Sequence, residues 1–180
     1  MFNLATHRRI LVLGGAASGK SVFAEKLILD HCREFGVTAD YLATLPRELA
    51  DGDLELAKKI AAHRCRRDQR WSLTEQAIKI APLIREETER PLLVDCLTLW
   101  LNNLIYQGLD CQNYFTELGN GVKDSTRPLV LVSNELGLGL VPAEAESRRF
   151  RQLQGELNQI AAAACDRVIL VIAGQPLVVK

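Results

Sequence analysis

The sequence predicts an α/β fold: a mostly parallel sheet flanked by helices, with an antiparallel strand at the C-terminal end. Two observations support this prediction. Short, uninterrupted apolar runs recur along the chain, as is typical of strands covered on both faces, and amphipathic helical patterns separate them. Strands that alternate with helices favour a parallel sheet with right-handed crossovers. The expected sheet strands are residues 10–13, 41–43, 92–94, 129–132 and 168–172.

Three segments between these runs have apolar residues at the spacing of one helix face. They are residues 21–32, 54–63 and 143–165. After the last core strand, Gly174-Gln175-Pro176 is a turn short enough to make the apolar segment 177–179 an antiparallel hairpin partner. Glycine, asparagine, aspartate and serine are concentrated in residues 119–127, which we therefore expect to form a loop within one domain spanning residues 1–180.

The composition bounds the class of protein. The chain has 180 residues, enough for one domain with its own core. Lys and Arg together number 22, as do Asp and Glu, so the formal net charge is zero, which argues against a protein that binds nucleic acid through a basic face. No apolar run approaches the roughly 20 residues that cross a bilayer, so no membrane span is expected. The five cysteines are far apart, without a CxxC pair, which favours reduced thiols and a cytoplasmic location.

A glycine-rich motif follows the first predicted strand. Its residues, which match GxxxxGK(S/T), are Gly14, Gly15, Ala16, Ala17, Ser18, Gly19, Lys20 and Ser21. A strand before the motif and an amphipathic helix after it are the context in which this pattern binds phosphates. Backbone amides then donate to phosphate oxygens, Lys20 neutralises the outer phosphates, and the Ser21 hydroxyl can bind Mg²⁺. The alternative, a strand-to-helix turn made of small residues, is the weaker interpretation in this context.

Three further positions each allow two interpretations. Asp95, directly after the 92–94 strand, is either a turn initiator or a carboxylate that completes a Mg²⁺ site, and the nearby phosphate loop favours the metal site. His63 is either part of a solvated helix end or a nucleophilic imidazole beside arginines that bind a triphosphate, and the local pattern alone favours the helix end. Segment 134–142 is either a strand-exit turn or a loop that approaches a bulky substrate.

Taken together, these motifs resemble the bifunctional adenosylcobinamide kinase / adenosylcobinamide-phosphate guanylyltransferases of cobalamin biosynthesis. The resemblance runs from Ile10 to Lys180. Beyond the phosphate loop it rests on segments 41–44, 59–64, 95–98, 134–142, 149–159 and 173–180, and on Trp71 and Glu75. The combination of segment 134–142, NELGLGLVP, with an upstream histidine is far more selective than the phosphate loop alone.

The resemblance implies a two-step transferase with Mg²⁺ as cofactor. A γ-phosphoryl group from ATP or GTP goes to the hydroxyl of adenosylcobinamide. GTP then loses pyrophosphate to form a GMP–histidine at His63, and GMP passes to adenosylcobinamide phosphate. Further implied nucleotide contacts are Ala43, Thr44, Leu45, Arg64, Cys65, Arg66, Arg67, Glu75 and Asp95. The implied fold is RecA-like, and the implied assembly is a homo-oligomer, with trimers among the family's members.

Two positions depart from the family's usual pattern. The family usually has arginine where this chain has Ala17, and it often has glutamate where this chain has Asp95. The loss of this guanidinium is expected to weaken phosphate binding or one of the two activities. The loop amides and Lys20, which also contact phosphates, remain. The alternative function is a P-loop small-molecule kinase without guanylyl transfer, which would leave His63 idle. A nucleotide-driven switch or strand-binding module is disfavoured by the neutral charge and by the lack of a guanine-reading NKxD motif.

Overall fold

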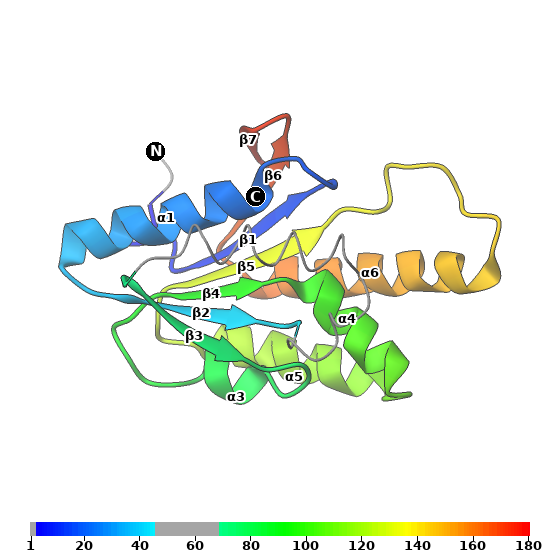
Figure 1. The fold of residues 1–180 in the computed structure, drawn as a ribbon, viewed down its shortest axis with the longest axis horizontal. Helices are drawn as coiled ribbons and strands as arrows, with labels where there is room; N and C mark the ends of the chain where they lie inside the picture. Colours follow the sequence, from blue (N-terminus) through cyan, green and yellow to red (C-terminus); the bar gives the residue numbers. More distant parts are fainter. Residues whose placement is uncertain (1–2, 46–68) are drawn as a thin grey trace.

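The computed structural model describes residues 3–45 and 69–180, which form a seven-stranded sheet with helices on both faces (Figure 1). The strand order is β3-β2-β4-β5-β1-β6-β7. The strands are β1 (Arg9–Gly14), β2 (Ala39–Ala43), β3 (Trp71–Glu75), β4 (Leu92–Asp95), β5 (Leu129–Asn134), β6 (Arg167–Ile172) and β7 (Gln175–Val178). Neighbouring strands are parallel except β6 and β7, which form an antiparallel hairpin. The predicted fold class is confirmed, including its antiparallel C-terminal strand.

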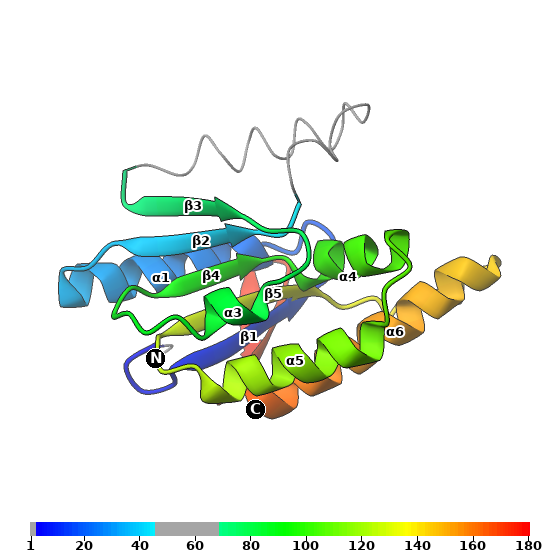
Figure 2. The same cartoon turned by 90° about the horizontal axis from the view of Figure 1, so that it is seen from below.

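Helices cover both faces of the sheet, as expected for strands made of continuous apolar runs. They are α1 (Lys20–Phe35), α3 (Ala81–Ile84), α4 (Leu97–Tyr106), α5 (Cys111–Asp124) and α6 (Ala145–Ala164). Figure 2 shows α3, α5 and α6 in front of the sheet and α1 behind it. Along β1, Leu11 belongs to the core shared with α4, α5 and α6, whereas Ile10 and Val12 belong to the core shared with α1. The sheet therefore separates two cores.

The edge strand β3 is not predicted by the sequence pattern. Four of its five residues, from Ser72 to Glu75, are exposed, so β3 lacks the continuous apolar run of the inner strands. An edge strand is covered less completely than an inner strand and needs no such run. Its pairing with β2, which places Trp71 beside Ala39, comes from long-range contacts instead. The helix predicted at residues 54–63 lies outside the described residues.

The loop predicted at residues 119–127 is wrong over most of its length, because α5 continues to Asp124. The glycines that suggested a loop serve close helix packing. A Cβ atom on Gly119 would lie 3.0 Å from Ile160 Cγ2 on α6, and one on Gly121 would lie 3.4 Å from the Cβ of Ala81 on α3. Glycine at these positions lets the helices approach, so a small residue here indicates packing rather than a break in the helix.

An ion pair joins the amino ends of β1 and β6. The Arg9 Nη2 atom lies 2.6 Å from Asp166 Oδ1, and the Arg9 backbone amide donates to Asp166 Oδ2 at 2.9 Å. These hydrogen bonds from Arg9 hold the pKa of the Asp166 carboxyl below its usual range, although partial burial acts in the opposite direction. The pair therefore ties the first strand of the chain to the last strand of the parallel part of the sheet.

We expect Asp166→Asn to lower the free energy of unfolding by about 1 kcal/mol at neutral pH, since the pair is partly exposed. The pKa of Asp166 is lower in the folded state than in the unfolded state. Its contribution is therefore complete above the ordinary carboxyl pKa of about 4 and is lost as the pH falls through the folded value. Urea unfolding of both proteins from neutral pH downward should show the two stabilities converging in acid. A difference that stays constant with pH would assign Asp166 a packing role.

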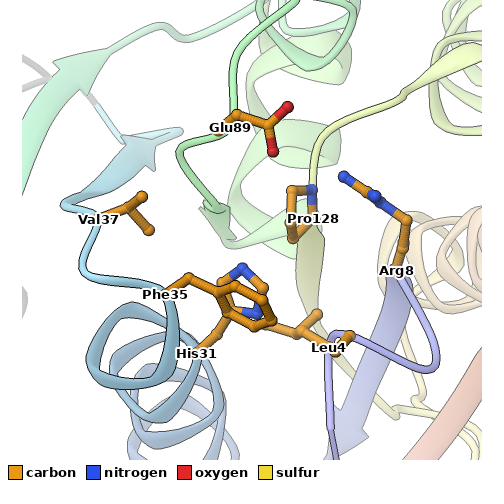
Figure 3. A pocket seen from close by; sticks show the side chains of 8 residues that line it. Leu4, Arg8, His31, Phe35, Val37, Glu89 and Pro128 are labelled. Atoms are coloured by element: carbon orange, nitrogen blue, oxygen red, sulfur yellow. The ribbon is translucent and has the colours of Figure 1, made fainter.

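A pocket of about 230 Å³ lies at the amino edge of the sheet, beside the C-terminal end of α1 (Figure 3). Its lining is largely apolar, with Arg8 and Glu89 on two sides and His31 next to Phe35. Burial lowers the pKa of His31, and its Nδ1 atom has no hydrogen-bond partner among the described residues. The amino ends of parallel strands lie opposite the carboxyl ends where such folds bind ligands, so this pocket is separate from the candidate site.

Candidate active site

The glycine-rich motif forms the connection between β1 and α1 at the carboxyl edge of the sheet (Figure 1). Gly14 ends β1, while Lys20 and Ser21 are the first residues of the 16-residue helix α1. Ala17 and Gly19 have positive φ angles of 55° and 92°, which let the chain turn sharply between strand and helix. Loop amides and a long helix's N-terminus thus meet at one place, an arrangement suited to binding an anion.

Lys20 folds back over this loop. Its Nζ atom donates to the Gly15 carbonyl oxygen at 3.1 Å. Burial lowers the pKa of Lys20, whereas the negative charge of Asp95 acts to raise it. Asp95 at the end of β4 is therefore close enough to Lys20 to affect its protonation, although β5 lies between β4 and β1, the strand that precedes Lys20. The cation and the carboxylate therefore lie near each other at the carboxyl edge of the sheet.

Strand register brings the other predicted residues to the same edge. Ala43, at the end of β2, pairs with Glu75 of β3 on one side and with Asp95 of β4 on the other. On β5 and β1, Asn134 pairs with Gly14. Because the carboxyl ends of parallel strands meet at one edge, Glu75, Ala43, Asp95 and the phosphate loop form a row along the crevice where ligands bind in such folds.

Tyr41 is a site residue that the sequence did not reveal. Its hydroxyl donates to Asp95 Oδ2 at 2.6 Å, and its side chain is only 1% exposed. The ring also contacts Trp71 edge to face, with centroids 5.6 Å apart. Tyr41 thus fixes the orientation of the Asp95 carboxylate. The available signal was a tyrosine within a buried strand, because a buried hydroxyl needs a hydrogen-bond partner.

Thr44 connects the ends of β2 and β4. Its hydroxyl donates to the Cys96 carbonyl oxygen at 2.7 Å and accepts from the Cys96 amide at 3.0 Å, and the side chain is fully buried. The Thr44 carbonyl accepts from Asn103 Nδ2 at 2.6 Å. These contacts give the Thr44 side chain a supporting role under the site. Its neighbours in the predicted contact set, Ala43 and Leu45, are half-buried.

The segment 134–142 leaves the same edge as a long loop before α6 (Figure 1). The Glu135 amide donates to the Gly14 carbonyl oxygen at 3.1 Å, which fixes the start of this loop against the phosphate loop. The Glu135 carboxylate accepts from the Gly137 amide, so it folds back onto its own loop. Leu138 and Leu140 are 81% and 96% exposed. The segment thus starts against the phosphate loop and exposes apolar side chains further along.

Five predicted residues lie outside the described residues: His63, Arg64, Cys65, Arg66 and Arg67. Their roles remain predictions from the sequence. The described chain stops at Leu45, just after β2, and resumes two residues before β3.

The donor atoms near the loop are compatible with Mg²⁺. In residues 3–45 and 69–180 no group of three or more His, Cys, Asp or Glu side chains is placed to hold a metal ion. Mg²⁺ needs no such group, since it commonly takes one or two protein oxygens together with phosphates and water. The Ser21 hydroxyl and the Asp95 carboxylate are hard oxygen donors of this kind, and the influence of Asp95 on Lys20 places the carboxylate near the loop. Bound there, Mg²⁺ would neutralise charge on the substrate phosphates.

Fold and site together are those of a P-loop nucleotide-binding protein. A family model described as "Cobinamide kinase / cobinamide phosphate guanyltransferase" matches residues 10–179. The chain belongs to this family. It is therefore a cobinamide kinase and cobinamide phosphate guanyltransferase, and the predicted enzyme class is confirmed.

Curated relatives agree with this assignment over nearly their full length. The chain is 42% identical over 178 residues to the bifunctional adenosylcobalamin biosynthesis protein CobP of Pseudomonas aeruginosa, covering 96% of this chain and 97% of that protein. It is 33% identical over 183 residues to the bifunctional adenosylcobalamin biosynthesis protein CobU of Escherichia coli, covering 92% and 96%. Among solved structures, the flagellar accessory protein FlaH of Methanocaldococcus jannaschii matches in fold, with a TM-score of 0.51 at 11% identity over 97% of this chain and 79% of that chain.

None of the helices in the described ranges has the length and apolarity to cross a membrane.

Proposed function

We propose that the protein phosphorylates adenosylcobinamide with ATP or GTP and then transfers GMP from GTP to adenosylcobinamide phosphate through a GMP–histidine at His63, giving adenosylcobinamide-GDP. The observation that carries this proposal is the arrangement at the carboxyl edge, where Lys20 lies over the phosphate loop and Asp95 ends β4 within electrostatic range of it. We also propose a cytoplasmic homo-oligomer, with a trimer as one candidate assembly, and light scattering of the purified protein tests the oligomeric state.

In the kinase step, the loop amides and Lys20 hold the outer phosphates while the hydroxyl of adenosylcobinamide attacks the γ-phosphorus. The bond from this phosphorus to the bridging oxygen breaks, and the nucleoside diphosphate leaves. Ser21 and Asp95 would hold the metal ion that this reaction requires. Because Tyr41 fixes the Asp95 carboxylate, this side chain is positioned before the nucleotide binds.

In the guanylyl step, the neutral His63 imidazole attacks the α-phosphorus of GTP and pyrophosphate leaves, so that a phosphorus–nitrogen bond replaces a phosphorus–oxygen bond. A phosphate oxygen of adenosylcobinamide phosphate then attacks the same phosphorus and releases His63. We assign Arg64, Arg66 and Arg67 to the triphosphate, because guanidinium groups bind phosphates through paired hydrogen bonds. The backbone around Cys65 belongs to the same proposed contact set, as do Ala43, Leu45 and Glu75.

The apolar loop after β5 suits a large acceptor. Leu138, Leu140 and Val141 are all more than two-thirds exposed and lie in the segment that begins against the phosphate loop. Exposed apolar side chains in a group mark an interaction surface. We propose that they contact the corrin macrocycle of the acceptor while its hydroxyl or phosphate reaches the nucleotide.

The test uses GTP labelled at either end of the triphosphate. With γ-labelled GTP, label should appear in adenosylcobinamide phosphate. With α-labelled GTP and Mg²⁺ alone, the denatured protein should retain label, and adding adenosylcobinamide phosphate should move that label into the small-molecule product. Phosphorylation without protein-bound label would instead support the alternative, a small-molecule kinase that lacks guanylyl transfer.

Asp95→Asn should impair Mg²⁺-dependent turnover far more than nucleotide binding in metal-free buffer. The reason is that the amide keeps the size of the side chain but loses the negative charge that a divalent cation requires. We expect a fall in kcat/KM of about 10²-fold, with a change of less than about threefold in metal-free affinity. Asp110→Asn is the matched control, because Asp110 is the N-cap of α5 and not one of the predicted site residues, and asparagine caps helices equally well. Equal losses in turnover and in metal-free binding would indicate a structural role for Asp95.

A further inference from the structure

The C-terminal hairpin contacts the phosphate loop directly. β6 and β7 are joined by the two residues Ala173 and Gly174, whose φ angles of 50° and 75° are those of a type I′ turn. The Gly174 amide does not serve the hairpin: it donates to the carbonyl oxygen of Ser18 at 2.8 Å. The turn at the end of the sheet is thus hydrogen-bonded to the middle of the phosphate-binding motif.

This hydrogen bond constrains the direction of a phosphate-binding amide. The Ser18 carbonyl and the Gly19 amide belong to one planar, trans peptide unit, in which C=O and N–H point in opposite directions. Because Gly174 holds the Ser18 oxygen toward the hairpin, the Gly19 N–H must point away from it. An amide fixed in this way loses little freedom when it donates to a phosphate oxygen, and fixed dipoles of this kind bind anions more strongly than mobile ones.

Close packing supports the same assignment. A Cβ atom on Gly14 would lie 2.7 Å from the Val171 carbonyl oxygen of β6, and one on Gly19 would lie 3.3 Å from Gly174 Cα. The hairpin atoms that such a Cβ atom would approach belong to the backbone at both positions. Rotating a side chain could therefore not relieve either contact. The phosphate loop therefore has the hairpin as a rigid support on this side.

We propose that the β6–β7 turn is a positioning element for nucleotide binding, in which the Gly174 amide orients the Ser18–Gly19 peptide toward the phosphates of the bound nucleotide. This inference rests on the proposed function, because its ligand is the nucleoside triphosphate in the phosphate loop. It adds to that function a residue remote in sequence from the loop, which no phosphate-binding motif includes.

The sharpest test replaces one backbone N–H with an oxygen atom. A synthetic peptide of residues 165–180 can be ligated to residues 1–164 at the native Cys165, with glycolic acid in place of Gly174. This ester has no N–H to donate, while the backbone path and the absence of a side chain are retained. The matched control carries the same amide-to-ester change at Val179, whose amide donates to the Val168 carbonyl oxygen at 2.9 Å within the hairpin region and not to the phosphate loop. The ligated all-amide protein is the reference.

The readouts are the affinity for a fluorescent GTP analogue and the urea midpoint of unfolding. We expect the ester at 174 to weaken binding about fivefold, the equivalent of one lost hydrogen bond, and to raise the KM for nucleotide in both half-reactions alike. The ester at 179 should lower the urea midpoint of unfolding about as much as the ester at 174 does. It should leave the affinity for the GTP analogue unchanged.

Two results would overturn the inference while leaving the proposed function in place. One is binding by the ester at 174 that equals binding by the all-amide protein. The other is an equal loss of affinity in both esters, which would mean that the hairpin acts only through general stability. Failure of the all-amide protein to bind the GTP analogue would overturn the proposed function, and the inference with it.

Discussion

Replacing Lys20 with alanine is expected to lower the rates of phosphoryl and guanylyl transfer together, each by a factor of 10²–10³. Lys20 is the cation at the phosphate loop, held over it by the hydrogen bond to Gly15. Removing a charge that contacts developing negative charge costs on the order of 3 kcal/mol of transition-state stabilisation, which gives this factor. Both reactions are affected because one loop holds the triphosphate for both. The measurement is kcat/KM for each half-reaction with purified protein.

Lys26→Ala is the matched control for this prediction. Lys26 lies on the same helix, α1, and is exposed to solvent, so the same substitution there tests for effects on the helix alone. Its activities should remain at the wild-type level. Near wild-type activity of the Lys20 variant in either half-reaction would mean that a second nucleotide site exists, and that a single phosphate loop does not serve both reactions.

Replacing His63 with alanine should eliminate the protein-bound GMP and the overall guanylyl transfer, while phosphorylation of adenosylcobinamide largely remains. The two reactions attack different phosphorus atoms. The kinase acceptor attacks the γ-phosphorus directly, whereas the imidazole must bond to the α-phosphorus and hold it. Label from α-labelled GTP that stays on the denatured protein measures the protein-bound GMP. The yield of adenosylcobinamide phosphate measures phosphorylation. His7→Ala provides a control histidine, because His7 contacts Arg167 at the amino edge of the sheet.

The chemistry of the adduct gives an independent check on His63. A phosphorus–nitrogen bond to imidazole is labile in acid and stable in base, unlike the ester that serine would form. The nucleophile must also be unprotonated, so adduct formation should weaken as the pH falls through the ordinary histidine pKa of about 6.5. A protein-bound label that alkali releases, or one of undiminished yield in the alanine variant, would contradict the assignment.

The inner strands could be predicted because burial on both faces requires an uninterrupted run of apolar residues. Residues 10–12 of β1, 92–94 of β4 and 129–132 of β5 are consecutive buried aliphatic residues, and apolar runs this short favour a buried strand over a helix. The exposed edge strand β3 has no such apolar run. Helix α5 was not predicted, and its last residues were assigned to a loop, because glycine signals a turn to a local pattern, whereas Gly119 and Gly121 permit helix contacts that only the folded chain makes.

The candidate site also has one part that the sequence predicts and one part that it does not. The phosphate loop could be predicted because its chemistry depends on residue types at fixed spacing within eight consecutive positions. The hydrogen bonds from Tyr41 to Asp95 and from Gly174 to Ser18 could not, since each joins residues far apart in the sequence. The first depends on the pairing of β2 with β4 and the second on the backbone of a turn, whose donor is present in every residue type except proline.

β1 is the first strand in the chain, yet it lies deep in the sheet. Its two neighbours begin at Leu129 and Arg167, and the Gly174 amide that holds Ser18 comes later still. Synthesis runs from the N-terminus, so the phosphate loop leaves the ribosome long before the strands that support it. Pairing over such sequence separations is also slow compared with local helix contacts. A nascent chain that ends before the β6–β7 turn therefore lacks the hydrogen bond and the close packing that support the phosphate loop on this side.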